Sequence, residues 1–304
     1  MKLNMNPAPH VHSPQDTRAL MGNVLIALLP CAVAGVLFFG IPALLLMLVS
    51  VCSAVLFEAL WQKLCGRKLL IADGSAAVTG LILAMNLPPR APWWLAVVGS
   101  AFAVVIVKGL FGGLGDNFIN PAMAARALLL ASWPKYMTAW TAPSGVDAVT
   151  SATPLMTPAA YTPLQMFLGR IPGCIGETCK LAILLGLAWL LVTRTIKWHI
   201  PVAMMASLCL FSWIFGKDPV AAVLSGGALF GAVFMATDYV TCPVHPAAQL
   251  IYAAGAGLIA AVIRSYAGYP EGVTYGILMM NAAAPLLDKC FKHRVYGHGR
   301  EAAN

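Results

Sequence analysis

The chain has 304 residues, of which 60 % are apolar and only 10 % are charged, and its mean hydropathy is +0.80. A soluble domain carries about 25 % charged residues, so this composition excludes a water-soluble globular protein and predicts an all-α, multi-span protein of the lipid bilayer. The net charge of +8 is typical of a membrane protein with Lys- and Arg-rich cytoplasmic loops, and we expect no nucleic-acid partner.

The N-terminal segment, residues 1–17, is polar and contains prolines. It lacks the short apolar core and cleavage site of a secretory signal, so we expect the first apolar block to stay in the protein as a helix. Ten apolar blocks are expected to be membrane spans: 20–39, 41–61, 75–88, 93–111, 119–133, 177–193, 198–215, 220–241, 246–263 and 272–288. The shorter blocks are typical of half-helices inside a bundle, where broken backbone is tolerated.

The spans divide into two groups of five, over 20–133 and 177–290, with a loop 134–176 between them and a tail 291–304. Leu83–Pro88 in the third span is echoed by Phe234–Asp238 in the eighth, and Asn120-Pro121-Ala122 is echoed by Asn281-Ala282-Ala283. Because each group would hold an odd number of spans, the two groups would form an inverted repeat. The alternative is that small residues recur in any membrane bundle because they allow close packing.

The distribution of Lys and Arg predicts that both termini are cytoplasmic and that the loop 134–176 is outside. The inside segments would carry Lys2, Arg18, Lys63, Arg67, Lys68, Lys108, Arg194, Lys197, Lys289, Lys292, Arg294 and Arg300, against Arg90, Lys135, Arg170, Lys217 and Arg264 outside. Arg126 and Lys180 fall within spans.

A glycine-rich turn and a polar helix start are the first candidate binding elements. The segment Lys108–Asn117 contains four glycines, Gly112 and Gly113 among them, which would let backbone approach a ligand and present N–H groups to it; a plain turn is the alternative. The next span begins at Asn117 and Asn120, whose amides both donate and accept hydrogen bonds and suit the polar edge of a flavin.

Charged residues within or beside the spans are the remaining candidates. Arg126 is costly in a membrane, so it would face the bundle interior, meet an anion or snorkel to the surface. Four carboxylates could handle a cation or proton, and a local helix cap or interfacial position is the alternative for each: Glu58, Asp73, Asp238 and Asp288. No catalytic or metal-binding pattern stands out: the eight cysteines form no C-x-x-C pair and mostly lie in apolar runs, with Cys174 and Cys179 the one pair worth testing.

The polar stretch Asp147–Leu155, with the sequence DAVTSATPL, lies between the two apolar groups. On composition alone, such a stretch is usually a loop. Together with DGSAAVTG at residues 73–80, FGGLG at 111–115 and YPEGV at 269–273, it resembles one family over about residues 20–290. That family is the D subunits of Rnf electron-transport complexes, which are homologous to the B subunits of sodium-pumping NADH:quinone reductases.

This resemblance implies ten helices in two inverted repeats and an FMN joined to Thr153 through a phosphoester bond, with Thr150 and Ser151 beside the phosphate. It implies a second, non-covalent flavin, riboflavin, near Asn117, Asn120 and Arg126. The complex would couple electron transfer between NADH and ferredoxin to Na⁺ or H⁺ transport in the bacterial inner membrane. The expected partners are the other Rnf subunits, among them a second FMN-bearing subunit and iron–sulfur subunits, and a flavin transferase during maturation.

Two other interpretations stay open at the level of the sequence. The chain could be the B subunit of a quinone reductase, although the short N-terminal segment favours the Rnf type. It could also be a non-redox transporter or channel with the same repeat, but such a protein would have no need of the stretch around Thr153. In either redox complex the subunit is not expected to be active alone.

Overall fold

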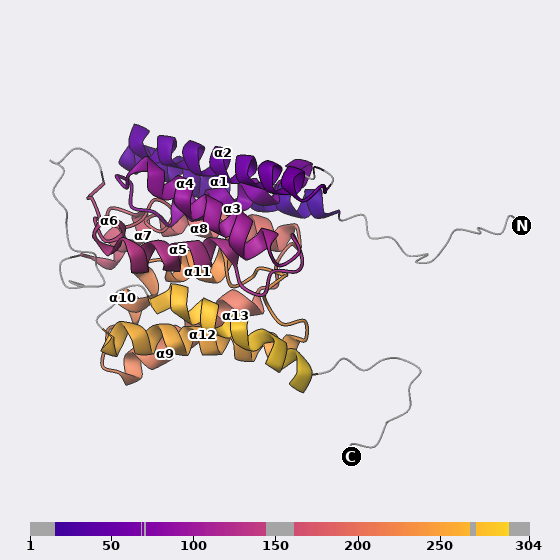
Figure 1. The fold of residues 1–304 in the computed structure, drawn as a ribbon. Coiled ribbons are helices and arrows are strands. Elements are labelled where there is room, and N and C mark those ends of the chain that lie inside the picture. Colours follow the sequence, from indigo (N-terminus) through magenta and orange to yellow (C-terminus); the bar gives the residue numbers. More distant parts are fainter. Residues whose placement is uncertain (1–15, 68, 70, 144–160, 268–271, 292–304) are drawn as a thin grey trace, which may run out of the picture.

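The computed structural model describes residues 16–67, 69, 71–143, 161–267 and 272–291. Within these ranges the regular elements are helices (Figure 1). The first group comprises α1 (Thr17–Phe39), α2 (Ile41–Leu64), α3 (Ser75–Met85), α4 (Trp93–Ala101) and α5 (Pro121–Ser132). The second comprises α8 (Lys180–Val192), α9 (His199–Ile214), α10 (Pro219–Leu224), α11 (Ala228–Phe234), α12 (Pro246–Tyr266) and α13 (Gly272–Cys290). Shorter elements are a 3-10 turn η1 (Ile71–Asp73), a π-helical continuation of α4 named η2 (Phe102–Gly109), α6 (Pro134–Met137) and α7 (Pro163–Leu168).

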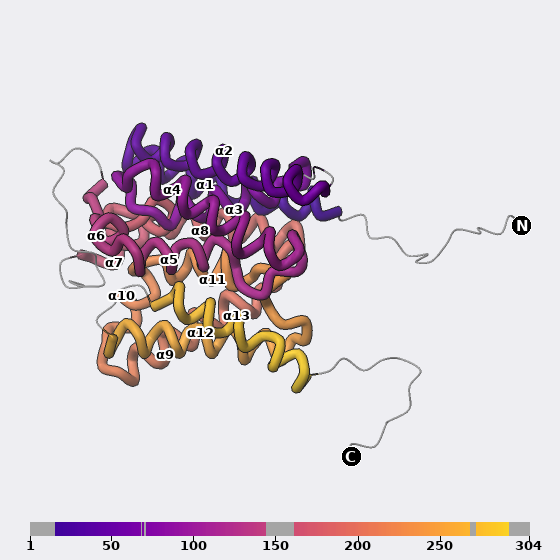
Figure 2. Tube along the Cα trace, viewed as in Figure 1, coloured from indigo at the N-terminus to yellow at the C-terminus, as the bar shows by residue number. Residues whose placement is uncertain are grey.

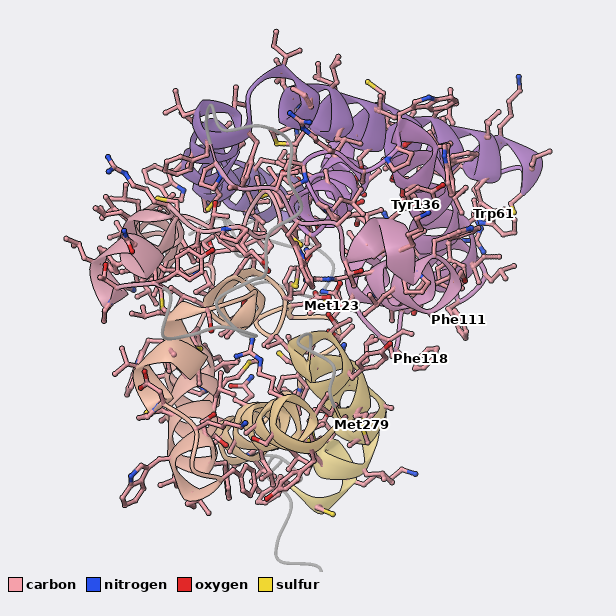
Figure 3. The ribbon with its side chains drawn as sticks, turned by 90° about the vertical axis from the view of Figure 1, so that its left-hand side faces the viewer. Trp61, Phe111, Phe118, Met123, Tyr136 and Met279 are labelled. Carbon is pink, nitrogen blue, oxygen red and sulfur yellow. The ribbon has the colours of Figure 1, made fainter. Side chains whose placement is uncertain are left out.

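The two groups of helices share one core. Helices α1 and α2 lie along one edge of the bundle and α9 and α12 along the other, with α5, α8 and α11 between them (Figures 1 and 2). Helix α2 packs on α3 and α4, α12 packs on α9 and α13, and α1 crosses to α8. Met123 of α5 lies between the groups in the side view of Figure 3 and is buried with Leu28, Leu83 and Phe230 in a single apolar cluster.

Helix length and composition agree with an all-helical membrane protein. Among the described residues, α1, α2 and α12 are long and apolar enough to cross a membrane, and five shorter helices are apolar as well. Large apolar side chains such as Leu37, Leu64 and Trp213 are exposed on the outside of the bundle, as lipid contact requires. The count of ten spans and the inverted repeat stay predictions.

The segment expected to form one span over 220–241 is instead two short helices followed by turns. Helix α10 ends at Leu224, α11 begins at Ala228, and residues 235–245 are irregular. The physical reason is the sequence Ser225-Gly226-Gly227, in which Gly226 takes φ 62°, a left-handed conformation that ends a helix and that glycine adopts at little cost. The break places polar backbone groups inside the bundle.

The described chain ends and the flanks of residues 144–160 lie at opposite ends of the bundle. Near one end, Met21 of α1 shares a cavity with Val240, and Asp288 of α13 accepts a hydrogen bond from the backbone N–H of Val244 at 2.9 Å. At the other end, Pro143 and Tyr161 share a cavity with the last residues of α1. The described residues on either side of 144–160 therefore lie at the end opposite Thr17.

The contact between α2 and α3 depends on Gly80, and we expect Gly80→Ala to lower the free energy of unfolding by about 1–3 kcal/mol. A Cβ atom there would lie 2.8 Å from the backbone oxygen of Ser50 and 2.9 Å from the Cβ of Ala54, neither of which is the flexible end of a side chain. Thermal unfolding in detergent measures the effect. Gly22→Ala is the matched control, since a Cβ at this helical glycine meets nothing within 4 Å; equal losses at both positions would contradict the prediction.

Candidate functional site

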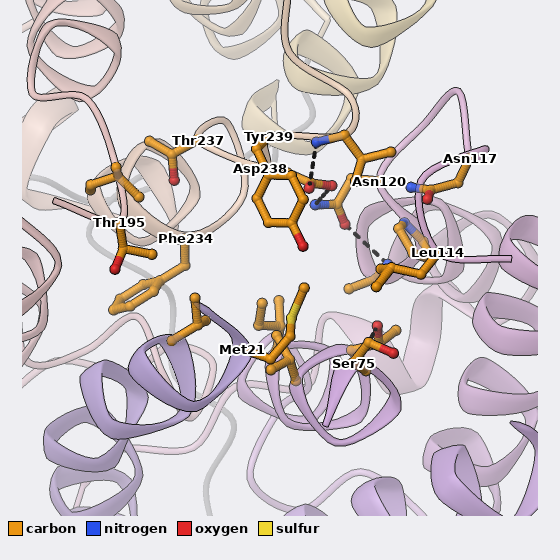
Figure 4. A pocket seen from close by; sticks show the side chains of 18 of the residues that line it. Met21, Ser75, Leu114, Asn117, Asn120, Thr195, Phe234, Thr237, Asp238 and Tyr239 are labelled. Atoms are coloured by element: carbon orange, nitrogen blue, oxygen red, sulfur yellow. Dashed lines mark hydrogen bonds between the residues drawn. The ribbon is translucent and has the colours of Figure 1, made fainter. Parts of the chain in front are cut away.

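A cavity between the two groups of helices is the main candidate site (Figure 4). Its empty volume is about 770 Å³, a figure that includes open solvent at its mouth. Its wall comes from α1, α3, η2, α5 and residues 190–240, and consists of Met21, Val24, Ser75, Val78, Thr79, Ile82, Lys108, Leu114, Asn117, Asn120, Pro121, Ala122, Leu190, Thr195, Ile196, Val233, Phe234, Thr237, Asp238, Tyr239 and Val240.

Asn120 and Asp238 join the two groups of helices at this cavity. Asn120 is the N-cap of α5, where its Oδ1 accepts from the backbone N–H groups of Ala122 and Met123 at 3.1 and 3.2 Å, a role that asparagine before proline favours. Its Nδ2 donates to Oδ2 of Asp238 at 3.4 Å (Figure 4). Asp238 is held in turn by the N–H of Val240 at 3.2 Å. The cap therefore fixes a carboxylate at the wall of the cavity.

Asn117 also lines the cavity and is buried. Its Nδ2 donates to the backbone oxygen of Ile119 at 3.3 Å. The second N–H and the side-chain oxygen of Asn117 can then bind a ligand. Phe111 and Phe118 pack edge to face, with ring centroids 4.9 Å apart, at the rim of the molecule in Figure 3. This contact between the two rings holds the glycine-rich turn against the segment that precedes α5.

A buried ion pair forms the wall between this cavity and a second one. Lys108 Nζ donates to Oε1 of Glu58 and to Oγ of Ser75, both at 2.6 Å. Ser75 Oγ donates to Oδ1 of Asp73 at 2.8 Å, so the ammonium group is linked to two carboxylates. Lys108 lines both cavities, whereas Glu58 and Asp73 line only the second.

The glycine-rich turn belongs to the second cavity. Gly112 and Gly113 line it with Arg67, whose Nη1 donates to the backbone oxygen of Gly112 at 2.6 Å. Gly112 has φ 126°, and a Cβ atom there would meet the side chain of Asp116. The turn therefore requires glycine at this position, and Gly112 and Gly113 line only the second cavity, whereas Leu114 of the same turn lines both.

Arg126 lies in a different cluster at the centre of the bundle. The residue is 3 % exposed, so it faces the interior and does not snorkel. Its Nη1 donates to Oδ1 of Asn86, and its Nη2 lies 4.0 Å from Oε2 of Glu177 and 3.6 Å from Sγ of Cys174. Glu177 Oε1 accepts from the N–H of Cys174 at 2.9 Å. The cluster joins the end of α3, α5 and the segment before α8, and it stands apart from Asn117 and Asn120.

Comparison with known proteins assigns the chain to a family. Residues 4–297 match the model of the NQR2, RnfD, RnfE family.

The chain belongs to this family.

Its similar relatives are D subunits of Rnf-type complexes. It is 48 % identical to the D subunit of the Na⁺-translocating ferredoxin:NAD⁺ oxidoreductase complex of Acetobacterium woodii, over 98 % of this chain and 96 % of the relative. It is 42 % identical to the proton-translocating counterpart of Clostridium ljungdahlii, over 94 % and 93 %. It is 36 % identical to the D subunit of the ion-translocating oxidoreductase complex of Escherichia coli, over 98 % and 99 %. The resemblance to Rnf D subunits predicted from motifs is confirmed.

Thr153, which is expected to carry FMN, lies outside the described residues, as do Thr150 and Ser151, which are expected beside the phosphate. The described residues that flank them, Pro143 and Tyr161, line a third cavity with Arg170. Cys174 and Cys179, both within the described residues, are not joined in a disulfide. Within the described ranges, no group of three or more His, Cys, Asp or Glu side chains could hold a metal ion.

Two buried lysines in the structure were not among the predicted site residues. Lys108 reads as an ordinary basic residue at the end of an apolar run, since its partner Glu58 is 50 positions away. Lys180, which is fully buried, donates to the backbone oxygens of Glu177 and Gly226 near the break between α10 and α11. The signal for both was a lysine inside an apolar block, which costs free energy unless partners are present.

Proposed function

We propose that this chain is the D subunit of an ion-translocating ferredoxin:NAD⁺ oxidoreductase complex in a bacterial cytoplasmic membrane. The observation that carries the proposal is the 48 % identity to such a protein over nearly the full length of both chains. The subunit passes electrons through flavins and has no turnover without its partners. These are the other subunits of the complex, with a second FMN-bearing subunit and iron–sulfur subunits among them, and a flavin transferase during maturation.

The proposed architecture is ten spans in two inverted repeats. Helices α1 to α5 would form the first repeat, and α8, α9, α10 with α11, α12 and α13 the second. The packing supports this: α2 contacts α3 and α4, and the corresponding α9 contacts α10, α11 and α12. Both termini would be cytoplasmic, because that arrangement places most Lys and Arg inside, and the segment with Thr153 would then face the opposite side.

The proposed attachment of FMN to Thr153 is supported by the motif around it and by its neighbours. Pro143 and Tyr161 are the described residues on either side of the segment that contains Thr153. They border a cavity together with Arg170, an exposed residue that carries a guanidinium group. A phosphodiester keeps one negative charge, which a guanidinium neutralises with charge-assisted hydrogen bonds. The side chains of Thr150 and Ser151 would be positioned to add neutral hydrogen bonds to the same phosphate.

The mixture of polar and apolar residues that line the cavity between the groups supports riboflavin as the proposed second flavin. A flavin ring has a polar pyrimidine edge and an apolar dimethylbenzene edge. The cavity offers Lys108, Asn117 and Asn120 on polar parts of its wall and Val24 and Ile82 on apolar parts. When bound, the flavin accepts and returns electrons, and the side chains bind it, orient it and keep water out. Arg126 would act at a distance by holding α3 and α5 together.

The proposed ion route follows the acidic residues that the structure places in or beside the cavities. Asp238 lines the candidate flavin cavity, while Glu58 and Asp73 line the second one. Asp288 lies at the same end of the bundle, bound to Val244. Since one similar relative is named for Na⁺ and another for protons, both ions are compatible with this set.

The function is tested in inverted membrane vesicles from a strain that lacks the chain and from the same strain with a restored copy. We expect ferredoxin-dependent NAD⁺ reduction, and the Na⁺ or H⁺ uptake coupled to it, to be lost without the chain and restored with it. Loss of NADH-dependent quinone reduction instead would favour the quinone-reductase role. Unchanged activity of both kinds, with a colourless purified protein, would favour a transporter without a redox role.

A further inference from the structure

Lys108 is a buried cation whose position the ion pair with Glu58 fixes. The residue is 3 % exposed and Glu58 is 5 % exposed. An ammonium group this deep needs partners with opposite charge, and it has one carboxylate directly and a second, Asp73, through the hydroxyl of Ser75. Its location is therefore set by groups on α2, η1 and α3 together.

The ammonium group has one donor beyond those bound by Glu58 and Ser75, and Lys108 borders both the candidate flavin cavity and the second cavity. A lysine carries three N–H donors and no acceptor. Two of them go to Glu58 Oε1 and Ser75 Oγ, which leaves one for a further acceptor among the groups around it. Of the three residues, Lys108 and Ser75 form part of the cavity wall, and Glu58 lies behind them.

Among the described residues that line this cavity, Lys108 is the cation and Asp238 is the carboxylate. The positive charge stands at the surface of the cavity, and the negative charge of Glu58 is set back behind it. The low dielectric of a buried site strengthens the interaction between a ligand and the nearer charge. A cation in the cavity wall therefore stabilises most strongly a ligand whose hydrogen-bond acceptor becomes more negative on reduction.

We propose that Lys108 donates a charge-assisted hydrogen bond to the pyrimidine edge of the flavin in this cavity and raises its reduction potential. The inference rests on the proposed function, in which that flavin is riboflavin. Reduction of a flavin increases the negative charge on its pyrimidine ring, so a cation at this edge stabilises the reduced form more than the oxidised form. Glu58 and Ser75 are positioning residues: they hold the ammonium group, and the carboxylate moderates its field.

The test uses the intact purified complex with Lys108→Gln, Glu58→Gln and the double variant. Riboflavin is quantified after acid extraction, and the reduction potentials of riboflavin and of FMN on Thr153 are measured by spectroelectrochemical titration. In Lys108→Gln we expect a more negative riboflavin potential, an unchanged FMN potential and riboflavin binding weakened about tenfold, the loss expected for one charged hydrogen bond. In Glu58→Gln we expect the riboflavin potential to move the opposite way.

The double variant keeps the test decisive if Lys108→Gln does not fold, because it leaves no buried charge unpaired. Its riboflavin potential should again be more negative than that of the wild type, since Lys108 is nearer the cavity. Lys63→Gln is the control, an exposed lysine one turn beyond Glu58 on α2, and it should change nothing. A riboflavin potential that is the same in wild type and in either Lys108 variant overturns the inference alone. A wild-type complex without riboflavin overturns the proposed cofactor and the inference with it.

Discussion

The Thr153→Ala variant is expected to lose all covalently bound flavin while the protein still accumulates in the membrane. A phosphoester needs the hydroxyl oxygen of the side chain, and alanine has none, so the effect is all-or-none rather than graded. Denaturing gel electrophoresis with flavin fluorescence, together with the mass of the peptide that contains residue 153, measures the change. Electron transfer through the complex should fall with the loss of the flavin.

Two neighbouring substitutions separate the attachment chemistry from general disturbance of the segment. Thr150→Ala leaves the hydroxyl of Thr153 in place and should keep the mass increment of one FMN. Thr153→Ser keeps an oxygen at the same position and should retain some attachment, set by how well the transferase accepts serine. FMN that stays with the denatured Thr153→Ala chain would disprove the assignment of this residue.

Replacement of Arg126 by Met is expected to cost about 3–5 kcal/mol of folding free energy, because it breaks the buried ion pair with Glu177. The guanidinium also bonds Asn86 at the end of α3, so the substitution loosens the contact among three separate parts of the chain. A loss of this size is a large share of the stability of a typical protein. We therefore expect the protein to be degraded or to unfold at a markedly lower temperature in detergent.

The double variant Arg126→Met with Glu177→Gln should recover part of that loss, since it removes both charges together. Arg90→Met is the control: the same chemical change at an exposed arginine should alter stability by no more than about 0.5 kcal/mol. Unfolding temperatures of all four proteins, measured in one detergent, give the comparison. If Arg126→Met and Arg90→Met are equally stable, the central cluster does not hold the bundle together.

Several parts of the fold and site could be predicted because their causes are local in the chain. Apolar run length is enough to identify the helices α1, α2 and α12, since a span of about 20 residues follows from bilayer thickness. Asn120 before Pro121 predicts the start of α5, because the cap and the proline act within one turn. The family motifs are likewise short segments whose order is visible without coordinates.

Other features depend on contacts between distant residues. The break of the expected span 220–241 at Ser225-Gly226-Gly227 was missed, because two glycines in an apolar run also occur within intact membrane helices. The family resemblance groups Arg126 with Asn117 and Asn120 near a flavin, yet the structure gives it Asn86 and Glu177 as partners. The direction in which the Arg126 side chain points from α5 depends on which neighbouring segment offers a hydrogen-bond acceptor.

By itself, the sequence determined the membrane class, the long spans, the α5 cap and the family, because run length, local capping and short motifs act over a few neighbouring residues. Only the tertiary structure decided which polar groups meet: Asn120 with Asp238 across 118 positions and Lys108 with Glu58 across 50. In an apolar interior a buried charge is stable only beside its partner. The partner is selected by how the helices pack, a property that belongs to the whole bundle and not to any one segment.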